Sequence, residues 1–300
     1  MTPYHVPVML KETLELLSID PNGIYVDVTY GGGGHSREIL ARLGAGGKLI
    51  AFDQDADAKR NLVEDERLEF VASNFAFIES ALEAQQIEGV DGIIADLGIS
   101  SHQIDTAERG FSYRFDAPLD MRMNTSEGIT AAEILNTYEE TELYRIFKVY
   151  GELPNAKKVQ HLVVERRASE EIRTTGQLET ILQSAIPHKR RAKFLAQVYQ
   201  ALRIEVNQEM EALEKLLLAS LNILKPGGRF VVMSYHSLED RMVKNFFRSG
   251  NLAGKVEKDF YGNDLSPWKR ITRKAIQASQ LEIDENNRAR SARLRAVERK

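Results

Sequence analysis

Short runs of apolar and β-branched residues recur through the first hundred residues, with helix-length segments between most of them. The runs occupy residues 23–30, 47–53, 68–73 and 90–98, and each ends in polar or glycine residues. Parallel strands joined by crossover helices account for this spacing economically. The pattern therefore predicts an α/β domain built on a parallel sheet.

After residue 123 the apolar positions follow a three-to-four spacing, which is typical of amphipathic helices. Thr137 with Glu140, and Thr174 with Gln177, have the spacing of capping boxes, and one long helix is expected to begin near Lys189. The strand pattern returns at residues 225–235, before an amphipathic helix and two further strands around Ile271 and Leu294.

These patterns predict a doubly wound α/β fold with an all-helical domain inserted into it. We expect residues 1–106 and 216–300 to form the α/β domain and residues 107–215 to form the insert. We find no internal repeat.

Composition narrows the class of protein. The chain has 300 residues, a net charge of −4 and no cysteine, which excludes disulfides and thiolate metal sites. No run approaches the ~18 apolar residues of a membrane span, and no secretory signal pattern opens the sequence, so we expect a cytoplasmic protein without a membrane partner. The charge is uneven: residues 241–300 hold 15 Lys and Arg against 7 Asp and Glu, and residues 151–203 hold 10 against 5. Two basic regions therefore accompany an acidic remainder.

Four consecutive glycines follow the first predicted strand, in "YVDVTYGGGGHS" at residues 25–36. No lysine follows as a P-loop requires, and the third glycine of a dinucleotide fingerprint is missing. S-adenosylmethionine has no pyrophosphate to bind, and it suits a turn of small residues after an acidic strand residue, here Asp27. Asp53 ends the second strand, where a carboxylate can accept hydrogen bonds from ribose hydroxyls.

Asp96 ends the fourth strand, beside the first. In a doubly wound sheet, ligands bind beyond the carboxyl ends of strands where the strand order reverses. The alternative is structural: a glycine-rich turn can serve tight packing alone, and an aspartate that ends a strand can be an ordinary turn residue.

Several stretches, "DVTYGGGGHS", "DLGISSHQID", "PLDMRM", "YQALRIEVNQE" and "SYHSLEDR" among them, resemble the bacterial 16S ribosomal RNA cytosine-N4 methyltransferases, the RsmH or MraW family. The resemblance runs the length of the chain. It implies a class I (Rossmann-like) methyltransferase fold that uses S-adenosylmethionine to methylate a decoding-centre cytidine of 16S rRNA, in the 30S subunit or a late precursor. We assign no metal-ligating residue, and whether a metal assists stays open. It leaves open whether the protein is a monomer or a homodimer. The cofactor contacts that the resemblance implies are Gly33, Gly34, His35, Asp53, Phe75, Asp96 and Gln103.

The chemistry of methyl transfer suggests further candidates. Cytosine N4 is a weak nucleophile, and an enzyme assists it by accepting hydrogen bonds from the amine and by positioning it. The polar and aromatic groups at the fourth and fifth strand ends that could do this are Asp96, Ser100, Tyr235, His236 and Ser237. His236 is the candidate proton shuttle. The alternative for His236 and Ser237 is helix capping, with Ser237 and Asp240 at capping-box spacing.

RNA recognition has candidates in both basic regions and in an earlier segment. Residues 109–123 alternate aromatics with arginines, which suits base stacking and phosphate contact, although the aromatics could instead pack one domain against the other. The residues concerned are Arg109, Phe111, Tyr113, Arg114, Phe115 and Arg122. Lys189, Arg190 and Arg191 could bind RNA or form a solvated helix face. Arg293 and Arg295, on one side of the last strand, could contact phosphates or keep an edge strand soluble.

Two other functions stay open at this point. One is a methyltransferase that acts on DNA or a small molecule; the other is a non-catalytic RNA-binding assembly protein. Substrate identity discriminates the first, and turnover discriminates the second.

Overall fold

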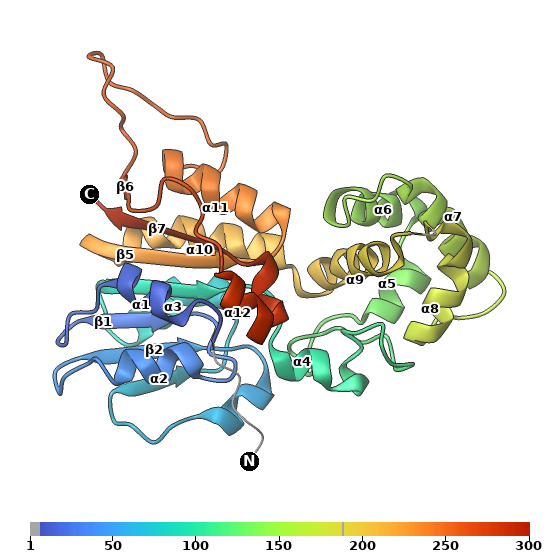
Figure 1. Ribbon diagram of the computed structural model, residues 1–300, viewed down its shortest axis with the longest axis horizontal. Coiled ribbons are helices and arrows are strands. Elements are labelled where there is room, and N and C mark those ends of the chain that lie inside the picture. The colour runs from blue at the N-terminus through green and yellow to red at the C-terminus, as the bar shows by residue number, and fades with distance from the viewer. Residues whose placement is uncertain (1–6, 188) are drawn as a thin grey trace. The chain divides into compact units, whose positions relative to one another are not determined.

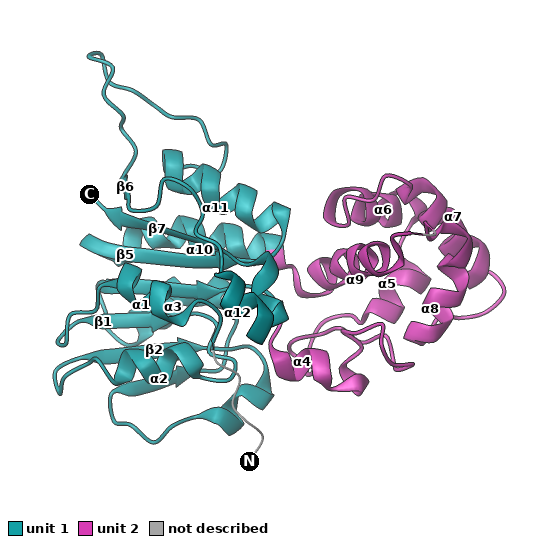
Figure 2. Cartoon of the chain, in the orientation of Figure 1, with its two compact units in different colours: residues 1–98, 210–300 teal, residues 99–209 magenta. Residues whose placement is uncertain are grey.

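The computed structural model describes residues 7–187 and 189–300, which form two compact units. The first comprises Met1–Gly98 and Met210–Lys300, and the second comprises Ile99–Glu209 (Figure 2). The units meet at residues 98/99 and 209/210, which is earlier in the chain than the boundaries that we predicted at 106/107 and 215/216.

The first unit is built on a seven-stranded sheet with the order β3-β2-β1-β4-β5-β7-β6 (Figure 1). The strands are β1 (Ile24–Asp27), β2 (Lys48–Phe52), β3 (Leu68–Val71), β4 (Val90–Asp96), β5 (Leu224–Ser234), β6 (Trp268–Arg270) and β7 (Arg293–Arg299). All pairings up to β4·β5 are parallel, and β7 is antiparallel to both of its neighbours. The five strands predicted before residue 240 are therefore present, as is the strand around Leu294; β6 ends immediately before Ile271.

Helices cover both faces of this sheet. One apolar core joins α3 (Ile78–Ala84), α10 (Glu209–Ile223) and α11 (Ser237–Ser249) to alternate strand residues such as Phe230 and Val232. The other joins α1 (Leu10–Leu17), α2 (Gly34–Leu40) and the short α12 (Gln280–Glu285) to the intervening residues, such as Val231 and Met233. Strands buried on both faces explain the continuous apolar runs in the sequence. Within the described residues, no helix has the length and apolar character of a membrane span.

The second unit is helical. It contains α4 (Ser101–Asp105), α5 (Ala131–Thr137), α6 (Glu140–Arg145), α7 (Ala156–Arg167), α8 (Thr175–Leu182) and α9 (Arg191–Asn207), with a π-helical turn over Ile146–Tyr150. Its core is separate from those of the sheet unit, with Leu135, Phe147 and Leu195 fully buried. The unit therefore has the separate apolar core expected of an inserted domain.

The structure confirms one of the two predicted capping boxes and contradicts the other. The Thr174–Gln177 capping box is present at α8. The Thr137–Glu140 box is wrong, because Thr137 Oγ1 donates to the carbonyl of Glu133 within α5, and Glu139 in extended conformation precedes α6. The N-cap position of α6 is Glu139, two residues after Thr137, and no side chain caps this helix.

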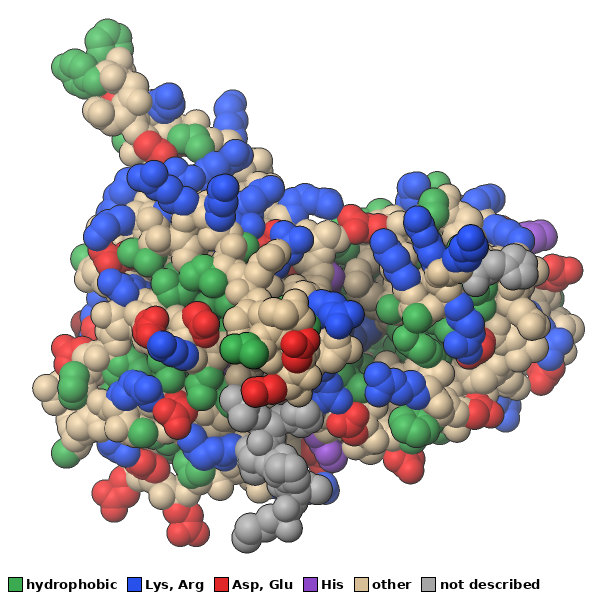
Figure 3. All heavy atoms as spheres, in the orientation of Figure 1, with side chains coloured by type: hydrophobic (Ala, Val, Ile, Leu, Met, Phe, Trp, Pro, Cys, Tyr) green, Lys and Arg blue, Asp and Glu red, His purple; other side chains and the backbone are tan. Residues whose placement is uncertain are grey.

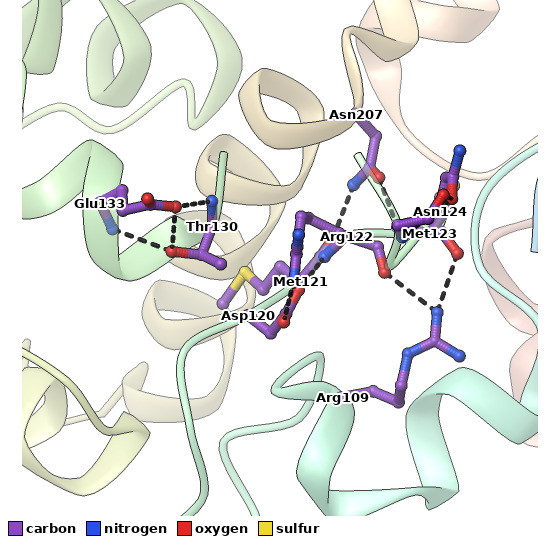
Figure 4. Close-up of polar contacts among 10 residues, drawn as sticks. Arg109, Asp120, Met121, Arg122, Met123, Asn124, Thr130, Glu133 and Asn207 are labelled. Atoms are coloured by element: carbon purple, nitrogen blue, oxygen red, sulfur yellow. Dashed lines mark hydrogen bonds and ion pairs between the residues drawn. The ribbon is translucent and has the colours of Figure 1, made fainter. Parts of the chain in front are cut away.

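The long helix expected from Lys189 is broken at Gln208, whose φ of 50° is left-handed. The side chain of Asn207 accepts from the backbone N–H of Met123 at 2.7 Å and donates to the carbonyl of Met121 at 2.8 Å (Figure 4). Met121 also has a positive φ, of 62°. The end of α9 thus fixes an irregular segment far away in the sequence, and periodicity alone could not reveal the break.

Candidate functional site

Three aspartates stand at the carboxyl ends of adjacent parallel strands. The strand order places β1 between β2 and β4, with Asp27 opposite Ala51 on one side and opposite Ile94 on the other. The connection after β1 runs through α2 on one face, whereas the connection after β4 reaches β5 through α10 on the other face. The order therefore reverses between β1 and β4, which is where doubly wound sheets bind ligands.

Asp27 is buried and its oxygens are occupied by the protein itself. The hydroxyl of Ser36 donates to Oδ2 at 2.7 Å, and the backbone N–H of Thr29 donates to Oδ1 at 3.0 Å. Burial raises the pKa of Asp27 above its ordinary value. Its visible role is to tie α2 to the end of β1, which holds the glycine turn in place.

The glycine turn itself is tightly packed. Gly31 and Gly33 have φ of 50° and 71°, which residues other than glycine rarely adopt. A Cβ on Gly33 would lie 2.6 Å from the hydroxyl oxygen of Tyr30, and one on Gly34 would lie 2.2 Å from Cγ of Pro7. Packing therefore requires both of the glycines that were predicted to bind cofactor, and Gly32 is left as the exposed member of the turn.

Asp53 connects the turn to β2. Its Oδ2 accepts from the N–H of Gly31 at 2.8 Å, and its Oδ1 accepts from the N–H of Asp55 at 2.8 Å. Burial raises the pKa of Asp53 to about 6, although these two hydrogen bonds act in the opposite direction and lower it. Each carboxylate oxygen has a second lone pair, so Asp53 can still accept from the hydroxyls of a ribose. The residues at this turn fit a nucleoside ligand.

Asp96 ends β4 at the same edge of the sheet. The hydroxyl of Tyr235, which follows β5, donates to its Oδ1 at 2.6 Å, and its backbone N–H donates to Thr29 Oγ1 at 2.7 Å. Burial raises the pKa of Asp96 to about 7; the Tyr235 hydrogen bond lowers it, and the charge of Glu239 raises it further. The side chain is still 25% exposed. A carboxyl group that titrates near neutral pH at a ligand-binding strand end is a candidate for proton chemistry.

His35 lies beside this carboxyl group. Its Nδ1 is 3.9 Å from Asp96 Oδ2, and its Nε2 is 3.2 Å from the carbonyl oxygen of Val8. Burial lowers the pKa of His35, so the ring is neutral at pH 7. Its hydrogen bond joins α2 to the segment before α1, which is a structural role in addition to any contact with cofactor.

His236 caps α11, and the capping box is one residue earlier than the expected Ser237–Asp240 pair. Its ring Nδ1 accepts from the N–H of Glu239 at 3.4 Å, and Glu239 Oε2 accepts from the N–H of His236 at 3.2 Å and from that of Tyr235 at 2.8 Å. His236 Nε2 also lies 3.0 Å from Glu239 Oε1. These contacts favour the capping alternative for His236 over a proton shuttle.

Glu239 was missed by the sequence reasoning. It fixes the backbone before α11 and, through its charge, raises the pKa of Asp96. Its position three residues after His236 is the capping-box spacing that could have found it, had the capping alternative paired His236 with Glu239 and not only Ser237 with Asp240.

The last two predicted cofactor contacts lie on different units. Phe75 opens the 3-10 helix Phe75–Phe77 after β3 and is half-buried against the core of the sheet unit. Gln103 belongs to α4 of the helical unit, where its side chain completes a capping box with Ser100. Each side chain therefore has a structural role of its own.

The aromatic and arginine-rich segment is mostly internal to the helical unit. Phe111 is buried, and Tyr113 packs edge-on against Tyr199 with ring centroids 5.6 Å apart, whereas Phe115 is exposed. Arg109 donates to the carbonyls of Arg122 and Met123, and Arg122 pairs with Asp120 (Figure 4). The same view shows a Thr130–Glu133 capping box at α5. Phe111 and Tyr113 thus pack within the core of their own unit, whereas packing of one domain against the other stays a prediction.

The other basic candidates differ in their pairing. Arg191 pairs with Glu179 on the helical unit, while Lys189 and Arg190 are exposed. Arg295 is buried and bonds to Asp240 Oδ1 at 2.7 Å, while the exposed Arg293 lies 3.6 Å from the same carboxylate. Both therefore neutralise Asp240. β6 lies outside β7, so the alternative that these arginines keep an edge strand soluble is wrong.

Comparison with known proteins adds to this geometry. A model of the MraW methylase family matches residues 2–300. A protein of Bacteroides thetaiotaomicron named "Ribosomal RNA small subunit methyltransferase H" is 55% identical over 297 residues, which are 99% of this chain and 98% of that protein. One of the same name from Flavobacterium johnsoniae is 55% identical over 296 residues, with the same coverage of both chains.

Among solved structures, one of a putative rRNA methylase from Clostridium thermocellum aligns with a TM-score of 0.46 at 11% identity, over 99% of this chain and 100% of that one. The family match bears out the resemblance seen in the motifs, and with it the expected methyltransferase class, Rossmann-like fold and cofactor S-adenosylmethionine. Since the match spans nearly the whole sequence and the relatives share more than half of its residues, the chain belongs to the MraW methylase family.

Proposed function

We propose that this protein methylates the exocyclic N4 of a specific cytidine in the decoding centre, in the P-site region of 16S rRNA. The relatives that are 55% identical over almost their whole length carry a ribosomal RNA small-subunit methyltransferase name, which supports this substrate class. We further propose that the enzyme works in the cytoplasm on the 30S subunit or a late precursor of it.

The cofactor would lie along the carboxyl ends of β1, β2 and β4. Asp53 would accept from its ribose hydroxyls, with the turn at Gly31–Gly34 beside it and Phe75 and His35 at its flanks. We also propose Gln103, on α4, as a cofactor contact, as the family resemblance implies. When bound, S-adenosylmethionine supplies an electrophilic methyl group on a sulfonium centre.

One observation carries the chemical part of the proposal: Asp96 is hydrogen-bonded by Tyr235 and has a pKa of about 7. The lone pair of cytosine N4 is delocalised into the ring, so a carboxylate that accepts from its N–H favours the pyramidal nitrogen that can attack. Tyr235 occupies Oδ1 and leaves Oδ2 for the amine. A group of this pKa can then take the proton that the methylated nitrogen loses.

The test is transfer of tritiated methyl groups from S-adenosylmethionine to 16S rRNA, free and in 30S particles, followed by nucleoside analysis. We expect the label in N4-methylcytidine at one position. Label in another nucleoside, in DNA only, or in no acceptor would contradict the proposal.

A matched pair of variants separates the site from the strand that carries it. Asp96→Asn should lower the transfer rate by about 10²-fold or more, as expected for loss of a general base. Asp91→Asn changes the same residue type near the other end of β4, where Asp91 accepts from Ile24 and Lys225, and it should retain activity.

A further inference from the structure

A hairpin projects from the chain between α11 and β6, and none of its residues takes part in the methyl transfer proposed above. Residues 257–265, here called the finger, extend away from the rest of the sheet unit (Figure 1). Lys258 and Asp264 form an antiparallel bridge, and the N–H of Asp259 donates to the carbonyl of Asn263 at 3.0 Å. The Asp259 carboxylate accepts from the backbone N–H groups of Tyr261 and Asn263. The finger is therefore a hydrogen-bonded turn with a defined tip.

The tip carries two aromatic side chains that nothing covers within the described residues. Phe260 is 98% exposed and Tyr261 is 86% exposed, the highest values among the large apolar side chains described. Their rings pack edge to face, with centroids 5.6 Å apart. Exposed aromatics on a rigid support commonly mark a binding surface, since water is an unfavourable environment for them.

The base of the finger is anchored in the core of the sheet unit. Trp268, three residues after the finger, is buried and packs against Phe246 and Phe247 of α11 with ring centroids 6.0 and 6.3 Å away. The chain is thus anchored in the core three residues beyond the finger.

Beside α11, β6 and β7 lies a strongly basic hollow of about 410 Å³. Seven of the eleven residues that line it are lysine or arginine and none is acidic, so it suits a polyanion. Figure 3 shows lysine and arginine side chains gathered below the projection, whose tip is hydrophobic.

Most of this positive charge is not neutralised by internal ion pairs. Arg293 and Arg295 neutralise Asp240. The remaining cations of the hollow are exposed and have no acidic partner within 4 Å among the described residues; they are Lys244, Arg248, Arg270, Arg273 and Lys274. Arg248 donates to the carbonyl of Gly254, which leaves its charge uncompensated.

We infer that the finger and the basic hollow together bind an unpaired stretch of RNA, at a docking surface distinct from the carboxyl-end crevice. Unpaired RNA presents base faces that stack on aromatic rings and phosphates that pair with lysine and arginine, and the surface offers both within one unit. A duplex hides its base faces and would leave the two aromatic rings of the tip without a stacking partner. This inference rests on the proposed function only in taking RNA as the substrate class.

The test measures binding of a fluorescein-labelled single-stranded RNA 12-mer of adenosine and uridine by anisotropy, across a salt series. The probe contains no cytidine, so it reports docking and not recognition of the acceptor base. We expect the unchanged protein to prefer it to a duplex of the same length.

The double variant F260A/Y261A should bind the 12-mer at least about 5-fold more weakly, because stacking on an aromatic contributes about 5-fold to 150-fold per base. The variant R273Q/K274Q should reduce the slope of log affinity against log salt by about 1.4, or about 0.7 for each phosphate that is no longer neutralised. The matched charge control is K11Q/K215Q, which removes two exposed lysines outside the hollow and should leave both quantities unchanged.

Affinity for S-adenosylmethionine and the melting temperature should stay the same in all of these variants, since the side chains changed are exposed. No binding of the 12-mer by the unchanged protein, or equal binding by the F260A/Y261A variant, would overturn the inference. So would a change in association state on sedimentation without a change in RNA affinity, which would make the finger a contact between copies of this chain. Failure of the proposed function would look different: the unchanged protein would then not methylate 16S rRNA, whatever the finger variants bind.

Discussion

Replacing Asp96 with asparagine should make the protein more stable at pH 8 while it disables methyl transfer. In the folded protein the pKa of Asp96 is about 7, against an ordinary value of 3.8. Keeping the ionised carboxylate at this partly buried position therefore costs folding free energy. Asparagine keeps the shape and an oxygen that can accept from Tyr235, and it carries no charge.

Proton linkage gives the sign and the size of the change in unfolding free energy that Asp96→Asn causes. Between pH 3.8 and 7 the folded protein binds a proton at Asp96 that the unfolded chain does not, so this group's contribution to stability is lost as pH rises through 7. The advantage of Asp96→Asn should therefore grow by about 1.4 kcal/mol per pH unit up to pH 7, or at most about 3 kcal/mol between pH 5 and pH 8. Because the side chain is 25% exposed, solvent offsets part of the cost, and we expect about 2 kcal/mol.

Urea unfolding of both proteins at pH 5 and pH 8 measures this difference. Asp91→Asn serves as the control: it removes a 2.9 Å ion pair with Lys225 and should gain no stability on going to pH 8. If Asp96→Asn is no more stable relative to the unchanged protein at pH 8 than at pH 5, the burial argument is refuted. If it unfolds at both pH values and loses activity only for that reason, Asp96 is structural and not part of the reaction.

Three further predictions follow from other contacts. Asp53→Ala should weaken S-adenosylmethionine binding by about 1–3 kcal/mol in calorimetry, and with a pKa of about 6 for Asp53 the affinity of the unchanged protein should fall as pH drops below 6. Arg295→Gln should lower the unfolding free energy by about 3 kcal/mol in urea titrations, because it leaves the buried carboxylate of Asp240 without its nearest cation, whereas the exposed Arg293→Gln should cost much less. Asn207→Ala removes three hydrogen bonds to backbone groups and should lower the melting temperature, with a cost of about 1–3 kcal/mol, while S-adenosylmethionine affinity persists.

The sequence predicted the sheet unit well because the relevant information is local. Each central strand is a run of apolar residues buried on both faces, and β1, β2 and β4 are each closed by an aspartate at or next to the last strand residue. Parallel pairing then brings Asp27, Asp53 and Asp96 to one edge with no further information. The pattern could not predict which hydrogen bonds each carboxyl group already makes within the protein. Asp27 accepts from the hydroxyl of Ser36, whereas Asp96 accepts from Tyr235 with one oxygen and keeps the other for a further partner.

The errors at helix ends have a common cause. Thr137, His236 and Asn207 each have a side chain that could bond to several backbone groups, and the tertiary structure decides which bond forms. His236 was considered as a proton shuttle because it follows the fifth strand, with helix capping as the alternative, and its ring nitrogen accepts from the helix as a serine hydroxyl would. The break at Gln208 depends on Met121 and Met123, more than eighty residues earlier in the chain.

The basic C-terminal region shows why charge counted along a sequence cannot locate an RNA-binding surface. Its excess of eight positive charges is compatible with any of its arginines touching phosphate. The structure separates them by their partners: Arg295 is buried against Asp240, whereas Arg273 and Lys274 face a hollow without acidic residues. A loss of RNA binding in an Arg295 variant could therefore arise from an unpaired Asp240 and a weakened β7, and would say nothing about phosphate contact. Arg273 and Lys274 are the residues whose substitution tests recognition without disturbing the fold, because their charges hold nothing else in place among the described residues.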